Sequence, residues 1–148
     1  MRDYTTYPSI PLGLALTAVL SGCAPEIGAR VAANAAAAAG SRSEIELRIL
    51  VPRCATAGCH SGNPPAVFPR LEEGASWDAM VGVSSEELPS MDLVEPGDPE
   101  RSYLVLKLRG TAGAQGGSGL RMPPSAAPLD EAELTGIEAW ITGGAPND

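Results

Sequence analysis

Residues 54–60 of this chain read Cys-Ala-Thr-Ala-Gly-Cys-His. Their cysteine and histidine side chains are the ones in this chain best suited to bind a metal or a cofactor. Cys54 and Cys59 are two of the chain's 3 cysteines, and His60 is its only histidine. A lone histidine with no activated nucleophile beside it argues against a hydrolytic triad. A structural zinc site needs four ligands, and the adjacent Cys59 and His60 would have difficulty pointing at one ion. The stretch therefore suits a ligand that Cys59 can contact at one atom while the adjacent His60 contacts another.

A haem is such a ligand, because a cysteine sulfur reaches a vinyl carbon at the porphyrin edge while the neighbouring imidazole reaches the iron at its centre. The usual attachment signal is C-x-x-C-H, whereas four residues separate the cysteines here. The macrocycle fixes the vinyl positions, so the two additional residues must bulge outward, and Ala55, Ala57 and Gly58 are small enough to permit this. A disulfide between Cys54 and Cys59, stabilising the fold by about 2 kcal/mol, is the alternative.

The composition also favours a cofactor. The 148 residues predict one domain, with only 4% aromatic residues and with 17 glycines and 14 prolines. A small domain with so few large side chains often depends on a disulfide, a metal or a cofactor to complete its core. The formal net charge of −8 argues against nucleic acid as a partner, because phosphates need a basic surface.

The N-terminal residues predict export and lipidation. Arg2 precedes an apolar stretch over residues 10–20, about as long as the apolar region of a signal peptide and too short to span a membrane. Residues 20–23 then read Leu-Ser-Gly-Cys and resemble the lipobox of bacterial lipoproteins, whose cysteine is lipidated and becomes the mature N-terminus. An ordinary cleaved signal peptide followed by a chance cysteine is the alternative.

The predicted organisation follows from this boundary. We expect a lipoprotein signal peptide over residues 1–22, an alanine-rich tether over 23–42 and a folded domain over 43–148. Lipidated Cys23 would hold the protein on a lipid bilayer. The expected location is the bacterial cell envelope, on the periplasmic side or at the outer membrane.

Four helices are expected in the domain. The first covers residues 43–51, where Ser43 and Glu46 form a capping box and Pro52 stops or kinks the helix. The second covers residues 75–81. The third has Asp98 as its N-cap, Pro99 in its first turn and a glycine at position 110 as its stop.

The fourth helix begins at Asp130, with Glu133 three residues later, and ends at Gly143. No segment alternates as a strand would, so the predicted fold class is all-α. Long loops over residues 61–69, 84–96 and 111–128 are expected to wrap around a bound group. The expected core or haem-wall positions on the helices are Trp77, Met80, Val81, Leu134, Ile137, Trp140 and Ile141.

The motifs follow one another in a recognisable order. After an apolar helix come Cys54…Cys59-His60, a proline-rich loop, Val94-Glu95-Pro96-Gly97-Asp98-Pro99, Ser102-Tyr103-Leu104, Arg121-Met122-Pro123 and a last helix with Trp140-Ile141…Gly144-Ala145. This order resembles the small cytochrome c-like modules of bacterial envelope proteins, including the planctomycete-type cytochrome c domains. The resemblance covers residues 43–146.

The resemblance implies an all-α, cytochrome c-like fold, in which three to four helices and long loops surround one covalent haem c. It implies that Cys54 and Cys59 attach the haem, that His60 is the proximal iron ligand and that Met122 is the distal one. The implied role is one-electron transfer with a redox partner protein and no catalysis. The acidic charge favours a basic partner. Met91 is a minor rival to Met122 as the distal ligand.

Two alternative functions stay open on the residues alone. One is a haem-free lipoprotein module with a Cys54–Cys59 disulfide, which binds a partner or a surface polymer. The other is a haem sensor or peroxidase-like protein with an open distal site. The glycine-rich residues 116–119 are expected to give the chain freedom to place Met122.

Overall fold

The computed structural model describes residues 40–124 and 126–148. The predicted signal peptide, Cys23 and most of the predicted tether lie outside these ranges. Within them helix is the only regular secondary structure, and the β-bridges are isolated. The expected all-α class is confirmed at this level. None of the helices formed by the described residues is long and apolar enough to cross a membrane.

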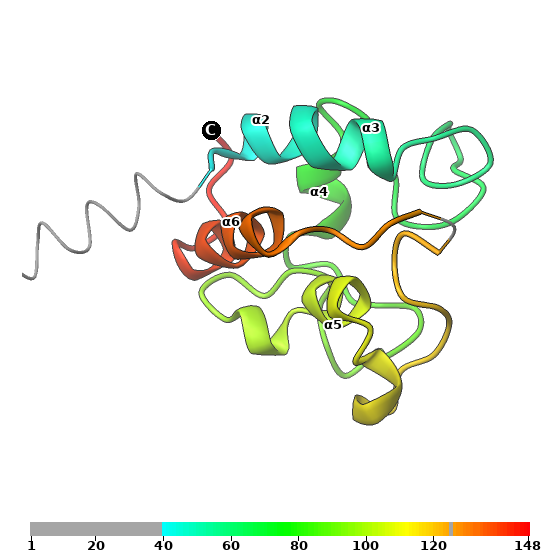
Figure 1. The fold of residues 1–148 in the computed structure, drawn as a ribbon, viewed down its shortest axis with the longest axis vertical. Helices are drawn as coiled ribbons and strands as arrows, with labels where there is room; N and C mark the ends of the chain where they lie inside the picture. Colours follow the sequence, from blue (N-terminus) through cyan, green and yellow to red (C-terminus); the bar gives the residue numbers. More distant parts are fainter. Residues whose placement is uncertain (1–39, 125) are drawn as a thin grey trace, which may run out of the picture.

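The first helical stretch is continuous and changes its winding along its length (Figure 1). It begins as α2 (Arg42–Ile45), passes through the π-helical η1 (Glu46–Leu50) and ends as α3 (Val51–Arg53). Its N-cap is Ser41, whose side chain accepts a hydrogen bond from the Glu44 amide at 3.2 Å. The helix therefore begins before the predicted residue 43 and ends after the predicted residue 51.

One prediction about this stretch is wrong. Ser43 and Glu46 do not form a capping box, because Glu46 is only 2% exposed and its carboxylate faces α4 (Ser76–Met80). Its Oε1 accepts hydrogen bonds from the Ser76 hydroxyl at 2.5 Å and from the Ser76 amide at 3.3 Å. It thus caps a different helix. The helix ends close to Pro52, as predicted: it continues for one residue beyond the proline and ends at Arg53.

The predictions for the second and fourth helices are confirmed. α4 lies within the expected range and buries Met80. α6 (Glu131–Thr142) begins with the predicted capping box: the Asp130 side chain accepts from the Glu133 amide, and the Glu133 side chain accepts from the Asp130 amide. The apolar positions expected on this helix are all buried, namely Leu134, Ile137, Trp140 and Ile141.

The predicted third helix is interrupted at Ser102. A 3₁₀ turn, η2 (Pro99–Arg101), comes first, with Asp98 as its N-cap, and α5 (Tyr103–Arg109) follows. The Ser102 backbone is extended, and its hydroxyl bonds the loop before it, donating to the Asp98 carbonyl at 2.9 Å and accepting from the Glu95 amide at 2.9 Å. The Tyr103 amide donates to the Asp92 carbonyl at 2.9 Å. Because these groups bond outside the helix, the helix cannot run through Ser102.

The predicted stop of the third helix is confirmed. Gly110 adopts a left-handed conformation with φ of 75°, and its amide bonds the last carbonyls of α5. A second 3₁₀ turn, η3 (Ala112–Gln115), follows directly. The chain then continues through the long segment that leads to α6.

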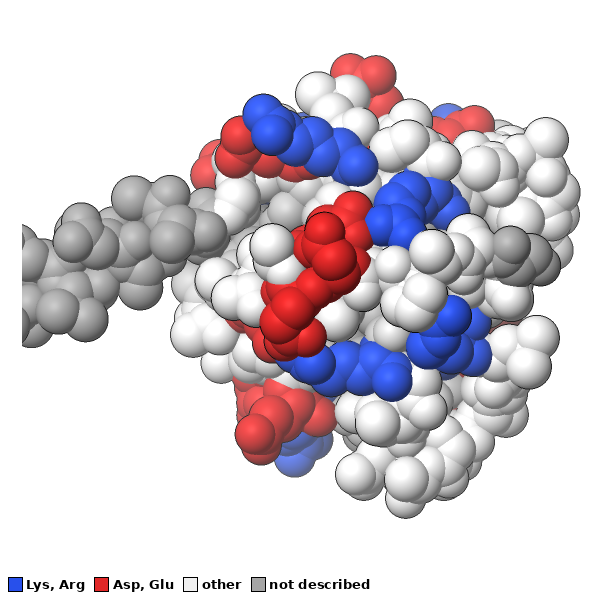
Figure 2. All heavy atoms as spheres, in the orientation of Figure 1, with Lys and Arg blue, Asp and Glu red and all other residues white. Residues whose placement is uncertain are grey.

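Charged side chains cover the outer face of α6 (Figure 2). Arg109 of α5 donates to Glu138 at 2.6 Å and to Glu131 at 3.2 Å, and Arg53 donates to Glu133 at 2.5 Å. Exposed ion pairs of this kind contribute little to stability. They do join α6 to the helices on both sides of it.

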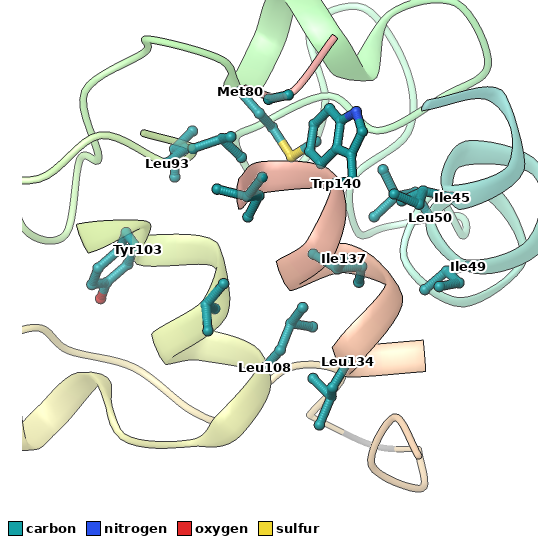
Figure 3. Packing of buried hydrophobic residues seen from close by; sticks show 14 of the residues in the cluster. Ile45, Ile49, Leu50, Met80, Leu93, Tyr103, Leu108, Leu134, Ile137 and Trp140 are labelled. Carbon is teal, nitrogen blue, oxygen red and sulfur yellow. The ribbon is translucent and has the colours of Figure 1, made fainter. Parts of the chain in front are cut away.

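The core surrounds the inner face of α6 (Figure 3). Ile137 and Trp140, which are 1% and 2% exposed, lie between residues of the first helical stretch on one side and residues of α5 on the other. Each such buried side chain stabilises the fold by roughly 1.5–3 kcal/mol. The labelled residues that pack around them are Ile45, Ile49, Leu50, Met80, Leu93, Tyr103, Leu108 and Leu134.

The loop after α3 and the segment before α6 lie at the same end of the molecule (Figure 1). Arg53 joins them directly: its guanidinium donates to the Ala127 carbonyl at 2.7 Å and to the Pro128 carbonyl at 3.1 Å. Residues 127 and 128, which lead into α6, therefore lie beside the place where the chain enters residues 54–60.

Candidate cofactor-binding site

Residues 54–60, which we call the 54–60 loop, close on themselves. The His60 amide donates to the Cys54 carbonyl at 3.3 Å, and the Cys59 amide donates to the Thr56 carbonyl at 3.0 Å. Residues 56–58 between them are exposed, and Gly58 has a φ of 78°, which favours glycine. The central residues of the loop therefore bulge into solvent, while Cys54 and His60 stay side by side.

Both cysteines of this loop are half-buried free thiols. Cys54 directly follows α3 and packs against the core. Its burial, the largest influence on it, raises the pKa of the Cys54 thiol to about 11. Cys54 is therefore a protonated thiol at neutral pH, and in this structure it is not joined to Cys59 by a disulfide.

The His60 ring is held by one backbone carbonyl. Its Nδ1 lies 2.8 Å from the Pro69 carbonyl oxygen. A carbonyl only accepts, so Nδ1 must carry the hydrogen, and in the neutral ring Nε2 then carries the lone pair. The His60 carbonyl also accepts from the Leu71 amide at 2.8 Å, which fixes the backbone. This is the arrangement that orients a histidine for metal ligation through Nε2.

A metal ion held by protein side chains alone does not suit this loop. Within the described ranges, no group of three or more His, Cys, Asp and Glu side chains could hold an ion. This agrees with the difficulty that the adjacency of Cys59 and His60 poses for zinc.

The methionines occupy different environments. Met80 is 1% exposed in the core, which confirms that it is a core residue. Met91 is half-buried in a local turn, where its amide donates to the Leu88 carbonyl at 3.0 Å. Met122 is half-buried too, and its amide donates to the Lys107 carbonyl of α5 at 3.0 Å. Met122 is therefore bonded to α5, and of these residues it is the nearest in sequence to Ala127, whose carbonyl accepts from Arg53 beside the 54–60 loop.

The expectation that the glycine-rich residues give Met122 freedom is wrong. A Cβ at Gly117 would lie 2.6 Å from the Tyr103 hydroxyl, and a Cβ at Gly119 would lie 2.7 Å from Lys107 Nζ. These glycines are needed because the chain lies directly against α5, not because it is free to move. No local pattern in the sequence indicates this contact.

The two loops also expose apolar side chains. Val67 and Phe68, beside the Pro69 that holds His60, are 45% and 39% exposed, and Leu120, two residues before Met122, is 69% exposed. Neighbouring Arg121 has a buried Nη1 without a hydrogen-bond partner in the described structure. The apolar side chains exposed beside Pro69 would suit contact with a large apolar group. The donor set of the 54–60 loop, two thiols and one oriented imidazole, is the chemistry that a covalently attached haem would use.

Neither protein-family models nor curated proteins nor solved structures gave a match to this chain.

Proposed function

We propose that this chain is a membrane-tethered, monohaem c-type cytochrome that transfers single electrons in the bacterial envelope. The observation that carries the proposal is the hydrogen bond of His60 Nδ1 to the Pro69 carbonyl at 2.8 Å, beside two free thiols. That bond prepares Nε2 as an iron ligand, and neighbouring Cys59 is free to reach the porphyrin edge. The domain would have the cytochrome c-like fold, with its long loops around the haem.

Each residue of the site has a stated role in this proposal. Cys54 and Cys59 would attach haem c covalently, His60 would bind the iron, and Met122 would bind it from the other side. The haem would supply the one-electron couple, whose potential depends on the axial ligands and on burial.

The surroundings of the domain complete the proposal. Cys23, outside the described residues, would carry the lipid anchor on the periplasmic side or at the outer membrane. The net charge of −8 favours a basic redox partner and disfavours nucleic acid. Because the reaction is electron transfer alone, the protein would not be an enzyme.

The direct test is covalent haem. Full-length protein from a host that attaches haem should show a haem absorption spectrum and keep its colour on a denaturing gel. Cys54→Ala and Cys59→Ala should each weaken or abolish the retained colour. Thr56→Ala, a change at an exposed position of the same loop that leaves both thiols in place, is the control and should keep it.

Two outcomes would contradict the proposal. A colourless wild-type protein whose mass shows one disulfide between Cys54 and Cys59 would support the haem-free binding module instead. A coloured protein that binds carbon monoxide in its reduced state without any mutation would have an open distal site and would support a sensor or peroxidase-like role.

A further inference from the structure

Lys107 holds the segment before Met122 from two sides. Its side chain lies on the buried face of α5, where the residue is 7% exposed. The Nζ atom donates to the Ser118 carbonyl at 2.9 Å, and the Lys107 carbonyl accepts from the Met122 amide at 3.0 Å. Both ends of residues 118–122, which we call the 118–122 segment, are therefore bonded to one residue.

Two further side chains complete this attachment. Tyr103, one helical turn before Lys107, donates its hydroxyl to Glu87 Oε2 at 2.7 Å and accepts from the Ser118 amide at 3.2 Å. Lys107 Nζ donates to the same Glu87 oxygen at 2.8 Å. Burial alone would raise the pKa of Glu87, but the hydrogen bonds from Lys107 and Tyr103 hold it below the ordinary value. Glu87 is thus the shared acceptor that fixes both donors.

The packing leaves no room between these side chains and the segment. A Cβ at Gly119 would lie 2.7 Å from both Glu87 Oε1 and Lys107 Nζ, and one at Gly117 would lie 2.6 Å from the Tyr103 hydroxyl. A real Cβ does not approach other atoms so closely. The glycines and the three polar side chains therefore form one fitted contact.

We propose that Lys107, Glu87 and Tyr103 form a clamp that positions Met122 as the distal iron ligand. The proposal rests on the proposed function, in which Met122 binds iron. A thioether is a neutral ligand, and its occupancy of the iron depends on how well the chain holds it in place beforehand. The clamp residues touch the backbone that carries Met122 and not the iron, so they are positioning residues.

The first test compares two variants of full-length protein that each remove one positive charge from α5. Lys107→Met removes both side-chain bonds of the clamp lysine, while Arg109→Met removes only ion pairs to Glu131 and Glu138. Amide hydrogen exchange in the 118–122 segment should accelerate by about tenfold or more in Lys107→Met, the size expected when hydrogen bonds to charged groups are lost. It should stay at the wild-type rate in Arg109→Met.

The same pair of variants is then compared with haem bound. Lys107→Met should weaken the sulfur-to-iron charge-transfer band of the oxidised protein, lower its potential and let carbon monoxide bind the reduced iron. Haem retained on a denaturing gel should not change, because the cysteines are untouched. Arg109→Met should show the wild-type band and potential.

A second pair avoids removing a buried charge, in case Lys107→Met does not fold. Gly117→Ala places a methyl group against Tyr103, whereas a Cβ at Gly113 meets nothing within 4 Å. Neither glycine has a positive φ. Gly117→Ala should therefore reproduce the loss of the band, and Gly113→Ala should not.

The outcomes separate the clamp from the proposed function. If Lys107→Met leaves both hydrogen exchange and the band at wild-type values, the clamp does not hold the segment. If exchange accelerates while the band and potential stay, the clamp holds the segment but does not position Met122, and the proposal is overturned. If wild-type protein binds no haem, or binds it without the band, the proposed role of Met122 fails and its positioning fails with it, whatever the exchange rates are.

Discussion

The 54–60 loop and the 118–122 segment lie at the same end of the molecule but are held in different ways (Figure 1). The 54–60 loop is closed by backbone hydrogen bonds within itself, such as that from the His60 amide to the Cys54 carbonyl. The 118–122 segment is held by the side chains of Tyr103 and Lys107, which Glu87 fixes in place, and by the backbone carbonyl of Lys107. One side of the proposed site is therefore built locally, and the other depends on how distant parts of the chain pack.

The largest expected effect comes from the core that both regions share. Ile137, 1% exposed on α6, lies between the first helical stretch and α5. Ile137→Ala should lower the free energy of unfolding by about 2–5 kcal/mol, because it removes buried contacts and leaves a cavity. Denaturant unfolding measures this change.

The matched control on the same helix is Thr135→Ala, at an exposed position, which should change stability by less than about 0.5 kcal/mol. If both substitutions changed the free energy of unfolding equally, the buried face of α6 would not be what joins the two regions.

Met122→Ala should remove only the distal iron ligand and leave the haem attachment and the proximal ligand intact. The charge-transfer band should disappear, the reduction potential should fall and carbon monoxide should bind the reduced iron, since a thioether favours reduced iron. Haem content should persist because Cys54, Cys59 and His60 are unchanged. Met91→Ala is the control; should it remove the band while Met122→Ala does not, the distal ligand is Met91.

Acid should loosen the 118–122 segment before the 54–60 loop. The pKa of Glu87 is lowered in the folded protein, so its contribution is present above the unfolded pKa and is lost as pH falls through the folded one. As pH falls below the ordinary pKa of a glutamate, hydrogen exchange in the 118–122 segment, corrected for intrinsic rates, should accelerate relative to the 54–60 loop.

Glu87→Gln keeps a hydrogen-bond acceptor at this position, but the amide does not titrate. The 118–122 segment and the 54–60 loop should then show the same pH dependence of hydrogen exchange. If the two regions lose protection together in wild-type protein, the carboxylate of Glu87 is not what holds the segment.

The smallest effect on the domain is expected from Cys23→Ser. The protein should leave the membrane fraction, because the acyl chains that give stable anchoring are no longer attached. The haem spectrum of the released protein should match that of the wild type, because both iron ligands are unchanged. Retention of Cys23→Ser in membranes would contradict the lipobox interpretation.

Local patterns predicted the elements whose signals lie within a few neighbouring residues. The capping box of Asp130 and Glu133 and the terminal Gly110 both match the structure. Glu46 shows where such reasoning fails. Its spacing from Ser43 suggested a cap within its own helix, but its carboxylate bonds Ser76, 30 residues later. A local pattern states which bonds a side chain can make, and packing decides which one it makes.

The sequence by itself determined the all-α class, the last helix and the short Cys-His loop, because their hydrogen bonds join residues close together in the chain. Only the tertiary structure decided that the Pro69 carbonyl orients His60, and that Lys107, Glu87 and Tyr103 hold the segment of Met122. The glycines at 117 and 119 illustrate the reason. In the sequence they indicate freedom, and in the fold they allow the backbone to lie against α5, because a contact between distant residues leaves no periodic pattern in the sequence.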